Sequence, residues 1–261
     1  RVASPPPMER AIHIFENGVR VYEDHLLEEQ RARYRKHNVH EAEEEGIFVQ
    51  LIRRLPLEGC FVDVGAAIGY YLILAHKLAP RLAIHGVEPL ARHRQMLAEN
   101  LVLNHITPDE FTIHEEGLTS SEGQAAFDDR GYSSRLADSS FATRRKRFLS
   151  GLGLRGRKDR LLAIPTITLD RLVRRIGRPI DLLQMDVQGL EVEVLKGATE
   201  SMQNGAVRTF LIGTHGRAKG LTLHEQCCEL LREHDYAIET DLPDTKEQPD
   251  GILVATKAWP A

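Results

Sequence analysis

One short segment combines an acid, small residues and glycines in a spacing that suits ligand binding. Residues 63–70 read DVGAAIGY, follow an apolar run and lead into an expected helix. In open α/β sheets, ligands bind outside the carboxyl ends of the strands. We expect Gly65, Ala66 and Ala67 to let a ligand approach the backbone, and Gly69 to let helix and strand pack closely. An ordinary tight turn would need the same glycines, so this segment alone is weak evidence.

A second acid, Glu88, lies about 20 residues beyond the turn, at the end of the next apolar run. A carboxylate at that place can accept hydrogen bonds from both hydroxyls of a ribose. The turn lacks the G-x-G-x-x-G spacing of dinucleotide-binding folds, so no pyrophosphate cradle is expected. S-adenosylmethionine (SAM) has a ribose and no pyrophosphate, and Asp63 would face its positively charged methionine end. The pattern therefore favours a SAM site, although an exposed acid that caps the helix after Pro89 would look the same.

Asp186 and His215 are the candidate catalytic residues, because each comes just after a buried strand and should lie at the same edge of the sheet. A hydroxyl that accepts a methyl group must lose its proton, and a positioned base contributes about 10²–10⁴ in rate. His215 has a near-neutral pKa and suits this task, with substrate binding or a structural role as alternatives. We expect Asp186 in the site, in contact with SAM, substrate or a metal. No spacing demands a metal, so none is predicted.

Apolar runs alternate with amphipathic segments from residue 60 onward, which indicates a parallel sheet with helices on both faces. Two further strands at the end of the sequence are joined by a loop too short for a crossover helix, so they should pair antiparallel. The fold class is therefore a doubly wound α/β sheet that is mostly parallel. The expected strands are 60–64, 83–87, 111–114, 161–164, 181–185, 207–212, 236–240 and 252–256, and the expected helices are 69–78, 90–103, 190–196 and 223–232.

The first 56 residues read as an extension of the main domain, which spans residues 57–261. Asn17-Gly18 lies between two alternating runs and predicts a short hairpin. Apolar residues in 40–55 follow helical spacing, with an acidic run in the first turns. A polar, basic insertion at about 129–160 interrupts the main domain. We interpret it either as a solvated loop or as a lid that attracts an anionic substrate.

The composition is that of a globular protein, with 42% hydrophobic and 28% charged residues. A net charge of −4 argues against nucleic acid as the main partner. No apolar run approaches the ~20 residues that a membrane span needs. Three cysteines without metal-type spacing indicate a reducing compartment, so we expect a cytoplasmic protein. The sequence starts at Arg1 without a signal-peptide pattern, and we expect a truncated or processed start.

The chain resembles the FkbM family of methyltransferases over roughly residues 41–257. The matching segments occur in the family's order, and the one around Asp186 is the most specific: FVDVGAAIGYY (61–71), GVEP (86–89), GLTSSEG (117–123), TLDRL (168–172), IDLLQMDVQGLEVEVLKGA (180–198) and THG (214–216). The resemblance implies a class I SAM methyltransferase fold, which is Rossmann-like. By similarity, Gly117 lies near the adenine, and the other SAM-site residues are Asp63, Gly65, Ala67, Gly69, Tyr70 and Glu88.

Three positions depart from the family pattern and put any role of the usual residues in doubt. The family usually has Asn at the position of Ala67, Glu at that of Gln188 and an acid at that of Gly213.

The resemblance implies methyl transfer from SAM to a hydroxyl oxygen of a small metabolite, such as a sugar or polyketide. The alternatives are an RNA or protein methyltransferase on the same fold, and a non-catalytic SAM-binding protein. A nicotinamide dehydrogenase is disfavoured by the missing glycine motif.

Overall fold

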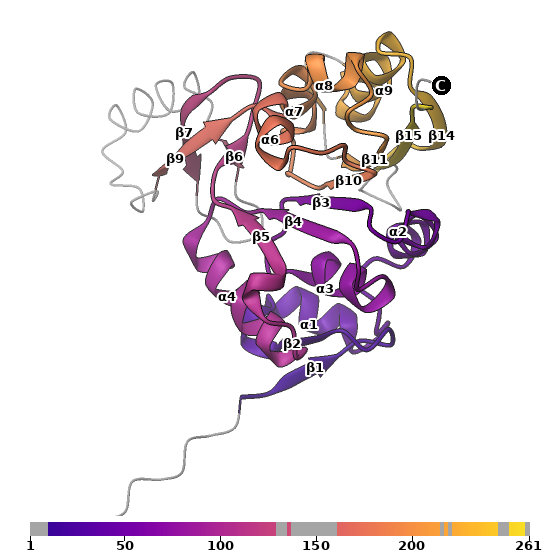
Figure 1. Ribbon diagram of the computed structural model, residues 1–261. Coiled ribbons are helices and arrows are strands. Elements are labelled where there is room, and N and C mark those ends of the chain that lie inside the picture. The colour runs from indigo at the N-terminus through magenta and orange to yellow at the C-terminus, as the bar shows by residue number, and fades with distance from the viewer. Residues whose placement is uncertain are drawn as a thin grey trace, which may run out of the picture.

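A seven-stranded sheet forms the centre of the molecule in this computed structural model, which describes residues 10–128, 135–136, 161–214, 217–218, 221–244 and 251–258 (Figure 1). All its neighbouring pairs are parallel except those of β15, which runs antiparallel to both β11 and β14. The predicted sheet and its antiparallel C-terminal pair are thus confirmed. In spatial order the strands are β14 (Ala237–Leu242), β15 (Gly251–Thr256), β11 (Thr209–Thr214), β10 (Leu182–Met185), β3 (Cys60–Val64), β4 (Ala83–Val87) and β5 (Phe111–His114).

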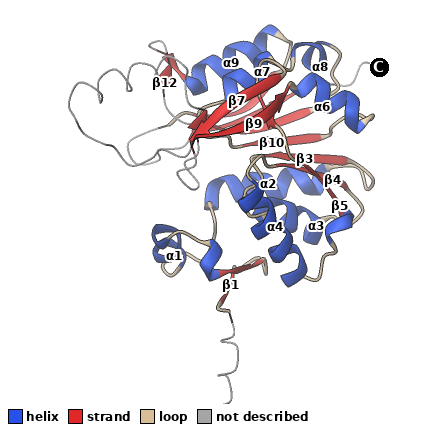
Figure 2. Ribbon diagram, turned by 90° about the vertical axis from the view of Figure 1, so that its left-hand side faces the viewer, coloured by secondary structure: helices blue, strands red, loops and turns tan. Residues whose placement is uncertain are grey.

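Helices cover both faces of this sheet, as Figures 1 and 2 show. Phe61 of β3 packs into the cluster on one face, whereas Cys60 and Val62 pack into the cluster on the other. Because both faces are buried, the strands read as nearly continuous apolar runs in the sequence. One face carries α2 (Ala42–Arg54), α3 (Tyr70–Leu78) and α4 (Ala91–Leu103), and the other carries α6 (Leu169–Ile176), α7 (Glu191–Lys196), α8 (Thr199–Gln203) and α9 (Leu223–Glu233).

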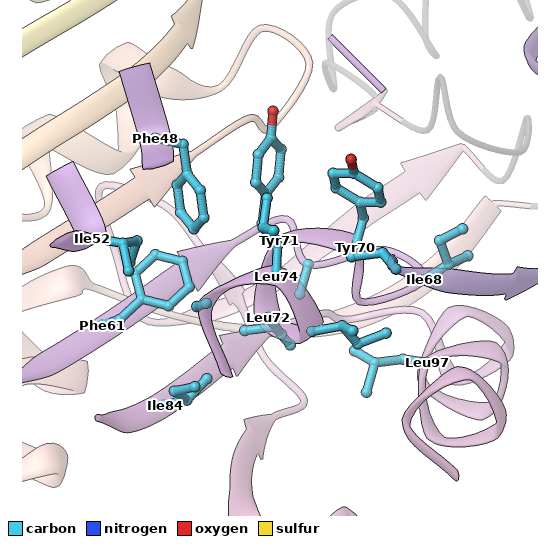
Figure 3. Packing of buried hydrophobic residues seen from close by; sticks show 14 of the residues in the cluster. Phe48, Ile52, Phe61, Ile68, Tyr70, Tyr71, Leu72, Leu74, Ile84 and Leu97 are labelled. Carbon is cyan, nitrogen blue, oxygen red and sulfur yellow. The ribbon is translucent and has the colours of Figure 1, made fainter. Parts of the chain in front are cut away.

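The N-terminal extension packs into the same core as α3. Its hairpin joins β1 (Ile12–Ile14) and β2 (Arg20–Tyr22) through the predicted Asn17-Gly18 turn, and it is followed by the 3₁₀ helix Glu23–His25 and by α1 (Glu28–Tyr34). Phe48 of α2 contacts Phe61 and Tyr71, with ring centroids 5.4 and 4.8 Å apart (Figure 3). The extension therefore contributes directly to the core that supports the first turn of the main sheet.

A second sheet stands beside the main one, in the order β6-β9-β7-β8. Only residues 161–164 of it were predicted as extended, and the structure continues that strand to residue 167. The basic insertion lies outside the described residues except for the backbone of β8. This sheet consists of β6 (Gly117–Leu118), β7 (Gly123–Asp128), β8 (Arg135–Leu136) and β9 (Leu161–Ile167). The remaining elements are the 3₁₀ helix Pro108–Glu110 and the strand pair β12 (Arg217–Ala218) and β13 (Leu221–Thr222).

The three cysteines, Cys60, Cys227 and Cys228, are buried and form no disulfide. The sequence predicted no disulfide framework, and the three free cysteines are consistent with that prediction. The cytoplasmic location stays a prediction. None of the described helices combines the length and the apolar character that crossing a bilayer requires.

Candidate functional site

The turn after β3 is held against β4 by its backbone. The N–H groups of Gly65 and Ala66 both donate to the carbonyl oxygen of Val87, at 3.0 and 3.1 Å. Gly65 and Gly69 have φ of 93° and 85°, in the left-handed region that favours glycine. Ala67 has φ of 45° although it carries a side chain, which is an uncommon conformation for alanine. The turn therefore has one defined shape, maintained by β4 at the cost of some backbone strain.

The two glycines also make room for protein atoms, which the sequence did not indicate. A Cβ on Gly65 would lie 2.2 Å from the carbonyl oxygen of Asp186, so its nearest neighbour is backbone beyond β10. A Cβ on Gly69 would lie 2.9 Å from Cγ of Leu97, so this glycine lets α4 approach rather than bringing helix and strand together. Both positions still require glycine, because each also has a positive φ.

Glu88 is buried at the end of β4, and its carboxylate is held by the turn. Oε2 accepts a hydrogen bond from the N–H of Ala67 at 2.9 Å, and Oε1 accepts one from the N–H of Leu90 at 2.8 Å. Nδ1 of His93 lies 3.4 Å from Oε1. The sequence offered a second interpretation, in which Glu88 is an exposed acid that caps the next helix. The bond to Leu90 partly agrees with it, although Glu88 is buried rather than exposed. A carboxylate has about four acceptor positions, so Glu88 can still bind a ligand hydroxyl.

An open pocket with about 670 Å³ of empty space, counting the part open to solvent, begins at this turn. Five predicted site residues line it: Gly65, Ala67, Glu88, Gly117 and Asp186. The other lining residues are Val64, Val87, Pro89, Leu90, His93, Leu118, Thr119, Ile164, Thr166, Val187, Gln188 and Leu190.

Sequence reasoning missed the part of the wall that the second sheet supplies. Ile164 and Thr166 of β9 reach the pocket from a strand that is distant in sequence from the turn. Leu118 lies next to the predicted Gly117, and its apolar side chain could have indicated from the sequence that it lines the pocket. His93 lies within α4, and nothing in its sequence surroundings distinguishes it from an ordinary helical histidine.

Four predicted residues do not line this pocket: Asp63, Ala66, Gly69 and Tyr70. Tyr70 instead turns toward the N-terminal extension, where its hydroxyl donates to Oε2 of Glu45 at 2.6 Å. The same hydroxyl accepts a hydrogen bond from Nδ2 of Asn17 at 2.6 Å. Figure 3 shows the rings of Tyr70 and Tyr71 next to each other, with both hydroxyls on the same side.

Asp63 is a buried acid with two other acids near it. The pKa of Asp63 is raised to about 8, mainly by burial and in addition by the negative charges of Asp186 and Glu88. No hydrogen bond to its carboxylate is found within the described part of the chain. The three acids together make a region in which a positive charge would be stabilised. A sulfonium or ammonium group satisfies that requirement, so the residues present fit the methionine end of SAM.

Gln188 restrains the carboxylate of Asp186. Its Nε2 donates to Oδ1 of Asp186 at 2.9 Å, and Gln188 itself has a positive φ of 54°. A glutamate, which the family usually has here, would place a second negative charge beside Asp186. The amide in this chain provides a donor instead, which orients Asp186.

His40 of the extension faces the same region and was not predicted. Its ring lies 4.6 Å from that of Tyr70, centroid to centroid, and Nδ1 is hydrogen-bonded to the hydroxyl of Tyr34. The pKa of His40 is lowered to about 4, mainly by burial and also by the charge of Arg33, against the opposing charges of Asp186 and Glu45. The imidazole is therefore neutral at pH 7 and lies within electrostatic reach of Asp186.

His215, the predicted base, lies outside the described residues. Thr214, the residue before it, ends β11 at the carboxyl edge of the sheet. The role of His215 thus stays a prediction.

A model of the FkbM methyltransferase domain matches residues 63–238 of this chain. The chain belongs to the FkbM methyltransferase family. The resemblance seen in the sequence is thereby confirmed, and the prediction of a methyltransferase is confirmed at the level of the family.

Two relatives share parts of the sequence. The AMB antimetabolite synthetase AmbE of Pseudomonas aeruginosa is 31% identical over 210 residues, which cover 70% of this chain and 10% of AmbE. A putative methyltransferase of Jannaschia sp. is 38% identical over 76 residues, which cover 29% of this chain and 25% of that protein. The matched region therefore spans only a small part of each relative.

Solved structures share the fold of this FkbM protein. A putative rRNA-methylase from Clostridium thermocellum matches with a TM-score of 0.53 and 10% identity, over 84% of this chain and 97% of the other. The magnesium protoporphyrin IX methyltransferase ChlM from Synechocystis PCC 6803, solved with bound SAM, matches with a TM-score of 0.50 and 11% identity, over 84% and 80%. At such low identity the likeness shows the fold alone, and it confirms the class I SAM methyltransferase fold.

Proposed function

We propose that this FkbM protein transfers a methyl group from SAM to a hydroxyl oxygen of a small metabolite. The observation that carries the proposal is the arrangement of three acids, Asp63, Glu88 and Asp186, around one turn beside an open pocket. Glu88 has acceptor positions left for ribose hydroxyls, and the buried acids favour the cationic methionine end. Gly117 and Leu118 form a close, apolar wall that suits the flat adenine.

When bound, SAM supplies a methyl group on a positively charged sulfur. The attacking oxygen must lie behind the methyl carbon, and holding it there supplies ~7–11 kcal/mol of the barrier reduction. In the transfer, the new O–C bond would form as the C–S bond to the methyl group breaks, so that the sulfur leaves as a neutral thioether. The acceptor's O–H bond would break as well, and its proton would pass to a base on the protein. We propose His215 for this base, or for a hydrogen bond to the hydroxyl, and Asp186 as the next candidate. Gln188 holds Asp186 in place for either role.

The N-terminal extension is the part of the chain that we propose for contact with the acceptor. His40, Tyr70 and Glu45 lie together on the side of the sheet that also carries Asp63. His40 is neutral and polar, so its imidazole suits a hydrogen bond to a hydroxyl group of the acceptor. The acids at this edge would repel a phosphate backbone, which favours a small molecule over RNA. An anionic group on the acceptor stays a prediction, because the basic segment that suggested it lies outside the described residues.

Two measurements test this function. Calorimetry should detect SAM binding at one site per chain, and labelled SAM should then pass its methyl group to some members of a panel of hydroxylated metabolites. Glu88→Ala should weaken SAM binding and lower the rate of transfer, whereas Glu115→Ala, which removes an exposed neighbouring acid, should change neither. SAM binding without transfer to any acceptor, including peptides and RNA, would favour the non-catalytic alternative. Transfer to RNA with steep salt dependence would favour the RNA methyltransferase.

A further inference from the structure

A buried group of metal-ligand side chains lies between α9 and β14, away from the pocket. His224 and Cys228 are one helical turn apart on α9, and Asp241 faces them from β14. One ligand atom from each residue lies within 4.8 Å of the other two. His224 and Cys228 are only 3% and 4% exposed, whereas the side chain of Asp241 is 48% exposed. The group is therefore inside the protein but open to solvent on the side of the acid.

The imidazole of His224 is fixed by contacts to both nitrogens. Nδ1 lies 3.0 Å from Oγ1 of Thr214, and Nε2 lies 2.8 Å from Oδ1 of Asp241. Gly251 of β15 leaves room for this arrangement, since a Cβ there would lie 2.5 Å from Oγ1 of Thr214 and 3.0 Å from Nδ1. Histidines that bind metals are commonly oriented by a hydrogen bond to the second ring nitrogen. Thr214 stands in that position, which leaves Nε2 directed toward the acid.

The group contains one negative charge, the carboxylate of Asp241, and has one positive charge, Arg232, beside it. A divalent ion bound here would stabilise Cys228 as a thiolate. Arg232 reaches Asp241 only at 3.4 Å and from the exposed side. One imidazole, one thiol and one carboxylate are also the donor types that zinc accepts.

We propose that His224, Cys228 and Asp241 bind one Zn²⁺ ion through Nε2, Sγ and a carboxylate oxygen. The thiol proton leaves to solvent when the ion binds, so the metal-bound form carries a thiolate. A water molecule supplies the fourth position, as in zinc sites with three protein ligands. Through Thr214 the ion stabilises the end of β11, the strand that precedes His215. The site is therefore structural, and it does not depend on the proposed methyl transfer.

Zinc and cobalt titrations of the whole chain test this site after removal of metals with a chelator. The parent should bind one Zn²⁺ per chain, with a rise in melting temperature, and Co²⁺ should give a thiolate-to-metal absorption band. Cys228→Ser should remove that band and the tight binding, and Asp241→Asn should weaken binding without disturbing the core. Cys227→Ser is the matched control, because Cys227 is an equally buried neighbour outside the group. It should bind zinc as the parent does.

Thr214→Val tests the site through a change in zinc affinity that unfolding of the protein would not produce. Removing an orienting hydrogen bond should cost about 10–100-fold in zinc affinity while the cobalt band remains. The proposal is overturned if the parent shows no stoichiometric binding. It is also overturned if Cys228→Ser and Asp241→Asn both bind zinc as tightly as the parent.

Discussion

The buried acid Asp63 makes SAM binding depend on pH in a direction that the structure specifies. With a pKa of about 8 in the ligand-free protein, about one tenth of Asp63 is ionised at pH 7 and about one hundredth at pH 6. The cationic methionine end of SAM favours the ionised form, so the apparent affinity falls with that fraction. We therefore expect SAM to bind about tenfold more tightly at pH 7 than at pH 6. Binding at pH 7 should release nearly one proton.

Calorimetry in two buffers with different ionisation enthalpies measures both the affinity and the released proton. Asp63→Asn removes the titrating group, so its affinity should vary little between pH 6 and pH 7 and should stay below that of the ionised parent. Glu44, another buried acid with a raised pKa, is the comparison: Glu44→Gln should keep the slope of the parent. A parent affinity that does not change with pH would refute this reasoning. So would an Asp63→Asn variant with the parent's slope.

The same shift predicts how stability depends on pH. The pKa of Asp63 is raised by folding, so the folded protein holds a proton that the unfolded chain releases above about pH 4. The ligand-free protein should therefore lose stability as the pH rises from about 4 to 8, by up to about 1.4 kcal/mol per pH unit from this group. Asp63→Asn should flatten that decline, which urea unfolding at pH 5 and pH 8 would measure.

Three further predictions concern single residues. Glu88→Ala should weaken SAM binding at least about tenfold, because two charge-assisted hydrogen bonds of about 1.5–3 kcal/mol each are lost before water compensates; unchanged SAM titrations would remove Glu88 from the site. Ala67→Asn should raise the free energy of unfolding by roughly 0.5–1 kcal/mol, since asparagine tolerates positive φ better, and a lower midpoint in urea would contradict this. His215→Ala should retain SAM affinity but lose about 10²–10⁴ in turnover, with little recovery in His215→Gln. If both His215 variants turn over within a few-fold of the parent, Asp186 becomes the first candidate for the base.

The main sheet was predictable because its strands are buried on both faces. Residues 60–64 are all buried, so the strand appears as a short apolar run that ends at the turn. Gly65 and Gly69 were expected for ligand approach and for close packing, and the structure adds a positive φ at both. Their close neighbours, the carbonyl of Asp186 and the side chain of Leu97, come from distant parts of the chain. No pattern within the turn could have identified them.

The second sheet and the contacts of the N-terminal extension were harder to predict for a physical reason. β7 and β9 are partly exposed and pair with each other across a long separation, so neither gives a strong local signal. Tyr70 follows the turn directly, and the resemblance to the FkbM family implied that it lies in the SAM site. Its hydroxyl is instead paired with Glu45, which the sequence placed in a different element. Such polar pairings depend on the packing of the extension and are visible only in three dimensions.

The position of β15 has a consequence for synthesis on the ribosome. β15 follows β14 in the chain, yet it separates β14 from β11 in the sheet. Until residues 251–256 have left the ribosome, β11 has an unpaired edge and β14 lacks its partner in the sheet. Unpaired edges of apolar strands readily join other chains. Nascent chains halted before residue 251 should therefore bind chaperones or aggregate, whereas the emergence of residues 251–256 from the ribosome completes the sheet in one step.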